Sequence, residues 1–188
     1  MTPLLLSAVT FLPALGAAGL LLVPRRYATF LKAAAVGIAI VTFALSGPLY
    51  AGFDGDSADY QFEERRAWMP TLGVSYHVGI DGISLLLVLL TTFLSPLALA
   101  SAWHAVEDRV KEFVITMLVL ESGMLGVFVS LDLFLFYVFW EATLIPMYFI
   151  IGVWGGQHRI YAAVKFVLYT MVGSVLMLVA ILALYYQH

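Results

Sequence analysis

The chain has 188 residues, of which 63% are hydrophobic and 11% charged, with a formal net charge of −3. A soluble domain carries about 25% charged residues, so this composition excludes an ordinary soluble protein and predicts one embedded in a lipid bilayer. The small negative charge offers no basic surface for nucleic acid. The absence of cysteine excludes disulfides, iron–sulfur ligation and thiolate catalysis. The four histidines have no metal-ligand spacing, so we expect no metal and no cofactor in this chain.

Six apolar runs of about 18 residues or more each predict a membrane-spanning helix. No run alternates in the manner of a membrane barrel strand. The first run lacks a positively charged start and a small-residue cleavage site, so we expect a retained helix and not a signal peptide. The fold class is therefore an all-α membrane protein, a polytopic bundle of about six transmembrane helices. The predicted spans are residues 3–23, 28–49, 80–102, 112–130, 132–153 and 161–186.

The connections divide the chain into two parts. Residues 1–111 hold the first three helices and a long exposed loop at 50–79, which is rich in Gly, Asp and Ser. Residues 112–188 hold the last three helices. Just after the loop, Asp81 and Ser84 are placed to cap the third helix, because their side-chain oxygens can accept from its free N–H groups.

The charges of the connections predict the orientation of the helices. Seven of the nine basic residues fall on the first, third and fifth connections, whereas the long second connection is mainly acidic. By the positive-inside rule, the odd-numbered connections face the cytoplasm and both termini face the periplasmic side. A bacterial plasma membrane and an organelle membrane both fit this pattern; since nothing resembles a transit peptide, we favour the bacterial plasma membrane. The seven residues are Arg25, Arg26, Lys32, Arg109, Lys111, Arg159 and Lys165.

Two carboxylates stand in the middle of otherwise apolar spans. Glu121 lies in the fourth span and Glu141 in the fifth. An ionisable group at that depth costs several kcal/mol unless it is neutralised or paired, so each one indicates a functional site. The two spans join near Ser130–Leu131, which places both carboxylates ~14 Å below that turn. If their faces converge, the pair would titrate as a unit and hold one exchangeable proton.

The residues around Glu141 suggest a hydrated environment. Tyr137, Leu144 and Tyr148 share its helical face, so two phenols flank the carboxylate. Pro146 removes a backbone N–H about one turn away and frees a carbonyl that could bind water. These features favour ion or proton handling. The alternative is a single buried acid that bonds to a tyrosine and has no role in transport.

Lys165 is a third candidate, near the start of the sixth span. Its aliphatic stem can extend to the membrane surface, which makes it an interfacial anchor in one interpretation. In the other, Tyr161 and Tyr169, at i−4 and i+4, continue a polar stripe inward, and Lys165 is the cytoplasmic end of a proton path. The sequence leaves both interpretations open.

Three blocks of residues carry a resemblance to a known family. They are Gly79–Ser84 (GIDGIS), Phe139–Tyr148 (FWEATLIPMY), and Trp154–Gly156 followed by Arg159–Thr170 (RIYAAVKFVLYT). The sequence resembles subunit M (chain 4) of NADH–quinone oxidoreductase, respiratory complex I, which is one of the antiporter-like subunits. The resemblance covers essentially all 188 residues.

The resemblance implies a proton-pumping module in the membrane arm of the complex. Residues 112–188 would begin its antiporter-like domain, with Glu141 as the key acid, Glu121 as an accessory acid and Lys165 as a further candidate for proton translocation. Its partners would be the bilayer and other membrane-arm subunits, including antiporter-like neighbours. NADH, FMN, iron–sulfur clusters and quinone would belong to other subunits, so the chain would be part of an enzyme without carrying a redox centre.

Members of this family are far longer than this sequence. The lysine that pairs with their key glutamate lies on the helix after the sixth, beyond His188. We therefore expect either an N-terminal piece of a longer protein or a chain whose missing helices come from another polypeptide. Two other functions stay open: a subunit of a multisubunit cation/proton antiporter, and a truncated scaffold that does not pump.

Overall fold

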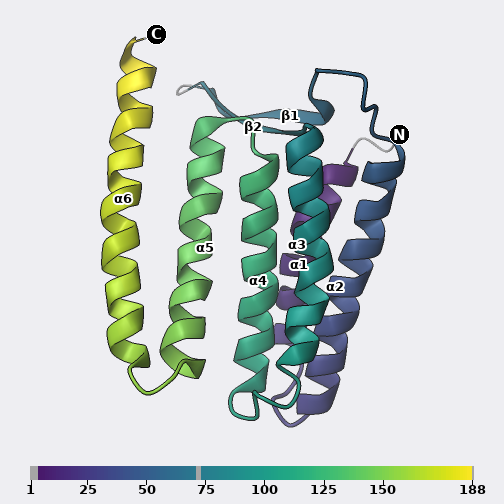
Figure 1. The fold of residues 1–188 in the computed structure, drawn as a ribbon, viewed down its shortest axis with the longest axis vertical. Coiled ribbons are helices and arrows are strands. Elements are labelled where there is room, and N and C mark those ends of the chain that lie inside the picture. Colours follow the sequence, from purple (N-terminus) through teal and green to yellow (C-terminus); the bar gives the residue numbers. More distant parts are fainter. Residues whose placement is uncertain (1–3, 71–72, 188) are drawn as a thin grey trace.

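The computed structural model describes residues 4–70 and 73–187, and within them the chain forms six helices and one β-hairpin. All six predicted helices are present (Figure 1). Five of the helices in this described part are long and apolar enough to cross a membrane, and α1, with 17 residues, is at the short limit for a span. The helices are α1 (Leu5–Leu21), α2 (Ala28–Ala51), α3 (Gly82–Ser101), α4 (Val110–Val129), α5 (Leu133–Trp154) and α6 (Arg159–Gln187).

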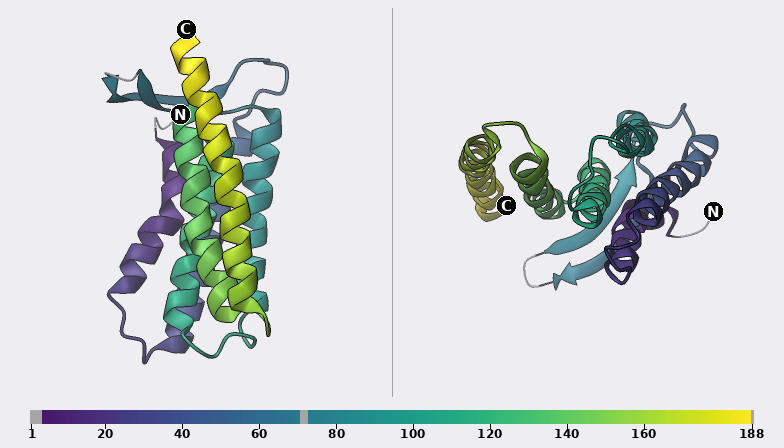
Figure 2. Two further views of the ribbon diagram at one scale, coloured as in Figure 1. Left: turned by 90° about the vertical axis from the view of Figure 1, so that its left-hand side faces the viewer. Right: turned by 90° about the horizontal axis from the view of Figure 1, so that it is seen from below.

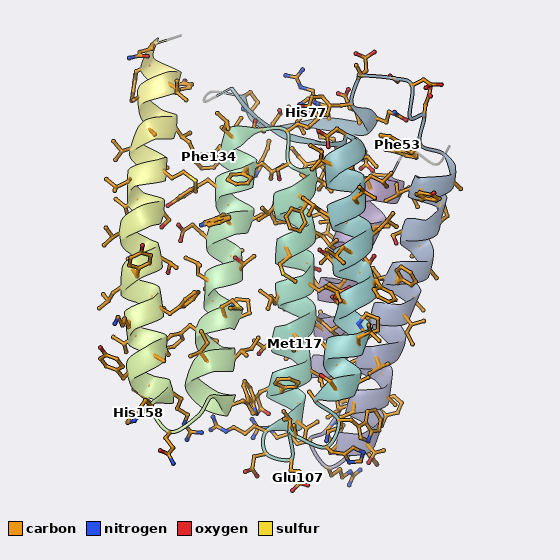
Figure 3. The ribbon with its side chains drawn as sticks, viewed as in Figure 1. Phe53, His77, Glu107, Met117, Phe134 and His158 are labelled. Atoms are coloured by element: carbon orange, nitrogen blue, oxygen red, sulfur yellow. The ribbon has the colours of Figure 1, made fainter. Side chains whose placement is uncertain are left out.

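The helices run up and down, so that one end of the bundle carries the hairpin and the other carries the short connections (Figures 1 and 2). We call them the hairpin end and the loop end; the loop end holds residues 22–27, 102–109 and 155–158. Of the labelled residues in Figure 3, His77 and Phe134 lie at the hairpin end, and Glu107 and His158 at the loop end.

Helix α4 is the centre of the bundle. It packs against α1, α2, α3 and α5, whereas α6 stands at the edge and packs mainly against α5. Two apolar clusters fill the bundle, one near each end. Buried hydroxyls such as those of Thr10, Thr42 and Thr92 donate to the carbonyl four residues earlier, which satisfies them inside their own helix.

The prediction of an exposed loop at 50–79 is wrong over much of its length, because the second half of this segment forms an antiparallel hairpin. Strand β1 spans Gln61–Met69 and pairs with β2, Val74–Ile80, with register shifts in two places. The apolar residues of β2 recur at every second position, and Val78 and Ile80 are fully buried against the bundle. This alternation covers only seven residues, which is too brief to identify a strand from the sequence alone.

The predicted cap of α3 is confirmed. The Asp81 carboxylate accepts from the Ser84 backbone N–H at 2.7 Å, and the Ser84 hydroxyl reaches back to the Asp81 backbone N–H at 2.8 Å, which completes a capping box. The hydrogen bond from the Ser84 N–H holds the pKa of the Asp81 carboxyl below its usual value.

Candidate functional site

Glu141 lies in the middle of α5 on the face that α6 covers. The residue is half-buried, and its Oε1 is buried without a hydrogen-bond partner in the described part of the chain. The Tyr137 hydroxyl lies beside the carboxyl and also beside Ser174 of α6, which is itself buried. Of the two phenols predicted to flank the carboxyl, Tyr137 therefore lies beside it and Tyr148 lines a groove together with Glu141.

A groove of about 740 Å³ runs between α5 and α6 past Glu141. Its walls are apolar except for this carboxyl and the Tyr148 hydroxyl. Few other polar side chains would therefore compete with Glu141 for an ion in the groove. The residues that line it are Val138, Glu141, Ala142, Leu144, Ile145, Tyr148, Phe149, Val164, Val167, Leu168 and Met171.

Glu121 has a different environment, closed on every side. The residue is 1% exposed, and neither carboxyl oxygen has a hydrogen-bond partner among the described residues. Ser95 of α3 lies beside it and donates to the Thr91 carbonyl. The next residue, Ser122, accepts from the backbone N–H of Ala14 in α1. This part of α4 therefore faces α1 and α3.

The contact between α4 and α5 is made through two glycines. A Cβ atom at Gly123 would lie 2.7 Å from Thr143 Cγ2, and one at Gly126 would overlap the ring of Phe139. Such distances leave no room for a side chain on this face of α4, so the two helices approach closely only because both positions are glycine.

This contact separates the two carboxylates. Glu121 stands two residues before Gly123, and Glu141 two residues before Thr143. Two residues turn an α-helix by about 200°, so each carboxylate points away from the interface that joins its helix to the other. The condition for a coupled pair is therefore not met: one acid faces α3 and the other faces α6.

Lys165 does not meet either acid. Its side chain is exposed, and its ammonium lies 5.7 Å from the centroid of the Tyr161 ring. Its neighbours Val164 and Leu168 line the groove, so Lys165 lies at the border of the groove face of α6, with its side chain outside the groove. This placement leaves the anchor and the path interpretations both open.

A polar hollow at the loop end was not predicted from the sequence. It has a volume of about 730 Å³ between the α3–α4 and α5–α6 connections. The Trp154 indole donates to the Asp108 carbonyl at 3.0 Å and ties the two connections together. The charges on the third and fifth connections were the available signal, but only the fold brings them together. The ionisable groups of the hollow are His104, Glu107, Asp108, Arg109 and Arg159.

A smaller hollow of about 280 Å³ lies between the polar hollow and the groove. It shares Gly152 and Val153 with the polar hollow, and Tyr148 and Phe149 with the groove. The three spaces therefore follow α5 in sequence from the loop end to Glu141.

Two families match adjoining parts of the chain. Residues 65–127 match the amino terminus of NADH-ubiquinone oxidoreductase chain 4, and residues 130–188 match the transmembrane family of NADH:quinone oxidoreductases and Mrp antiporters. NADH-quinone oxidoreductase subunit M of Rhodobacter capsulatus is 57% identical over 185 residues, which are 96% of this chain. The chain belongs to the subunit M/chain 4 family.

Other members of this family are similar over the same region. NADH-ubiquinone oxidoreductase chain 4 of Marchantia polymorpha is 42% identical over 97% of this chain and 37% of its own length. The chain covers 36% of the Rhodobacter subunit. It thus spans about a third of the length of these relatives.

Two solved structures have a similar fold. A chain of respiratory complex I from Thermus thermophilus with bound NADH matches with a TM-score of 0.79 and 32% identity, over 94% of this chain and 35% of that one. The Mrp complex from Dietzia sp. DQ12-45-1b matches with a TM-score of 0.76 and 20% identity, over 93% of this chain and 19% of that one, which shows a common fold.

Proposed function

We propose that this chain belongs to a proton-translocating membrane-arm subunit that couples quinone reduction by NADH to proton pumping. The observation that carries the proposal is the position of Glu141, a carboxyl halfway along a membrane-spanning helix. One of its oxygens is buried without a partner among residues 4–70 and 73–187, and it lies beside an apolar groove. A structural carboxyl at that depth would be enclosed and fully hydrogen-bonded, whereas a proton carrier needs a face that other groups can reach.

The chemistry follows from the surroundings of the carboxyl. In an apolar groove the protonated form of Glu141 is stable alone, and the ionised form needs a nearby cation. A basic group that approaches through the groove would stabilise the ionised form and release the proton, and its withdrawal would favour protonation again. Tyr137 and Ser174 supply hydroxyls that accept or donate a hydrogen bond in either state.

We further propose that protons reach Glu141 from the loop end. The polar hollow there holds His104, Glu107 and Asp108, which can exchange protons with water. The smaller hollow and the groove continue from it to the carboxyl. With the positive-inside orientation, this end faces the cytoplasm and the hairpin faces the periplasm of a bacterial plasma membrane.

The other candidate residues receive lesser roles. Glu121, enclosed and with neither oxygen hydrogen-bonded among the described residues, is proposed as an accessory acid that exchanges protons rarely. Lys165 is exposed on α6, where a further helix or a neighbouring membrane-arm subunit could meet it. NADH, FMN, iron–sulfur clusters and quinone are assigned to other subunits of the complex.

The test is Glu141→Gln in the complete complex in native membranes. We expect proton pumping per NADH oxidised to fall at least about tenfold, because glutamine keeps the shape but cannot exchange a proton. The amount of assembled complex should stay unchanged. Glu141→Asp, which keeps the carboxyl, is the matched control and should retain part of the activity.

Normal pumping by an assembled Glu141→Gln complex would contradict the proposal. Transport that requires sodium and proceeds without NADH would instead favour a cation/proton antiporter. Assembly of the complex with no effect of Glu141→Gln on any transport would favour a scaffold.

A further inference from the structure

The outer edge of the hairpin is covered by the turn that joins α4 to α5. The backbone N–H of Leu131 donates to the His77 carbonyl at 2.9 Å, and Ser130 forms an isolated antiparallel bridge with Val78. The turn therefore extends the two-stranded sheet beyond β2. Trp68 of β1 adds an aromatic contact with Phe134, at 6.3 Å between ring centroids.

One carboxylate joins this extended sheet to the start of α5. Asp132 Oδ1 accepts from the backbone N–H groups of Phe134 at 2.9 Å and Leu135 at 3.2 Å, which caps the helix. Its Oδ2 accepts from the backbone N–H of Ser75 in β2 at 2.9 Å. Each oxygen thus serves a different element.

The hairpin is itself fixed to the rest of the bundle. Ser7 of α1 donates from its backbone N–H to Glu64 at 3.1 Å, and its hydroxyl lies 2.6 Å from the Tyr76 hydroxyl. Burial raises the pKa of Tyr76, so this phenol stays protonated. Strand β2 leads directly into the capped start of α3. The hairpin is therefore a fixed reference for the depth of neighbouring helices.

Apart from its contacts with α4 and α6, helix α5 is held at its start by Asp132. Leu135 and Pro146 are its buried residues, and its remaining length is partly or fully exposed in this structure. Glu141 lies nine residues after Asp132, about 13.5 Å along the helix. A helix behaves as a rigid rod over this length, so a shift at Asp132 is transmitted to Glu141.

We propose that Asp132 is a positioning residue, which sets the depth and rotation of Glu141 by linking the start of α5 to the hairpin. Its importance for transport rests on the function proposed above for Glu141. The link itself is a property of the fold and can be tested without transport. Disruption of the link lets α5 shift or rotate, and Glu141 then changes its exposure to the groove.

Two variants break the link from opposite sides. Asp132→Asn has only one acceptor oxygen, so it cannot cap α5 and accept from Ser75 together. Ser75→Pro removes the donating N–H and leaves Asp132 intact. Proline is tolerated there because this N–H points away from β1.

Two matched controls keep the link. Ser75→Ala retains the backbone N–H and removes only the hydroxyl, which is 3.4 Å from Asp132 Oδ2. Asp81→Asn makes the same substitution at the cap of α3, a helix that carries no candidate acid. Both controls test whether any substitution at the hairpin end, even one that keeps the link, changes the exposure of Glu141.

The first readout is the rate at which a hydrophobic carbodiimide modifies Glu141 in the assembled complex, measured by mass spectrometry of the peptide. This rate depends on the exposure of the carboxyl and requires no pumping. The second readout is the pH profile of proton pumping per NADH oxidised. A merely structural role of Asp132 would lower the amount of complex without moving either readout.

We expect Asp132→Asn and Ser75→Pro each to change the modification rate by about tenfold, the size of effect expected from one hydrogen bond to a charged group. Both should shift the pH profile, and both controls should match the unmodified complex. Unchanged rates in the two variants would overturn the proposal. A changed rate together with normal pumping by Glu141→Gln would uphold the positioning role and refute the proposed function.

Discussion

The two intramembrane carboxylates stand at similar depth in neighbouring helices but in opposite surroundings. Glu121 is enclosed by α3 and α4, with both oxygens buried, whereas Glu141 borders a groove that reaches toward the loop end. The difference arises from the glycine contact between α4 and α5, which turns the acids away from each other. The depth of a carboxylate in the membrane is therefore not sufficient to identify a transport site. The carboxylate must also be accessible to other groups that can exchange a proton with it.

The largest effect should come from adding a side chain to the glycine contact between α4 and α5, which separates the two carboxylates. Gly126→Ala places a methyl group where the Phe139 ring lies, so α4 and α5 must move apart. We expect a loss of about 1–3 kcal/mol in stability, as for other overpacked cores. The measurement is thermal unfolding of the purified complex in detergent.

Gly173→Ala is the matched control, because a Cβ atom there meets no atom within 4 Å in the described structure. It introduces the same change in helix propensity. The double variant Gly126→Ala with Phe139→Leu should recover part of the loss. Equal stability of both single alanine variants would refute the close contact.

The second prediction compares the two acids in transport. Glu141→Gln should lower pumping at least about tenfold, but Glu121→Gln less than about threefold, since an enclosed acid exchanges protons rarely. The measurement is the ratio of protons moved to NADH oxidised in membrane vesicles. A larger loss with Glu121→Gln would reverse the assignment of the primary acid.

The third prediction compares their chemical access. A hydrophobic carbodiimide should modify Glu141 about tenfold faster than Glu121, because a reagent can enter the groove but not the enclosed site. The two peptides are quantified from one sample, so each carboxylate is the control for the other. Similar rates would mean that the Glu121 site opens often.

The smallest effect concerns Asp81, a carboxylate outside the membrane spans that provides a reference for the two buried ones. The pKa of the Asp81 carboxyl is lower in the folded protein than in the unfolded chain, so the ionised carboxylate stabilises the fold. This stabilisation is fully present above the unfolded-state pKa and is lost as pH falls through the folded-state pKa. Asp81→Ala should cost about 1 kcal/mol at pH 7. Below about pH 4 the difference in stability between Asp81→Ala and the unmodified protein should become smaller.

Asp81→Asn is the control, because asparagine caps helices about as well and does not titrate. Thermal unfolding between pH 7 and pH 3 measures all three proteins. A difference between Asp81→Ala and the unmodified protein that stays constant over this range would contradict a contribution from the ionised carboxylate.

The sequence predicted the helices because each is a long apolar run whose length alone identifies a span. It also predicted the cap at Asp81, since a cap depends on residues three positions apart. The hairpin was missed because β1 carries four charged residues in succession and β2 contains mixed polar residues, so that composition indicated a loop. The alternation in β2 was visible but too brief to decide the assignment.

The site was predicted in its residues but not in its geometry. Counting residues gives the depth of Glu121 and Glu141, but rotation depends on which helix faces meet. In an apolar helix no polar stripe reveals that face, and only the contacts at Gly123 and Gly126 determine it. The polar hollow at the loop end was missed for a similar reason, because its residues come from connections that are far apart in sequence.

The hairpin also has a consequence for the order of folding. Its contacts join residues far apart in sequence: Ser7 with Glu64 and Ser75 with Asp132 are each separated by 57 positions. During synthesis from the N-terminus, β1 and β2 can pair with each other and with α1 before α5 exists. The outer edge of β2 then stays uncovered until the α4–α5 turn arrives, and α5 gains its cap and its link to the sheet in the same step.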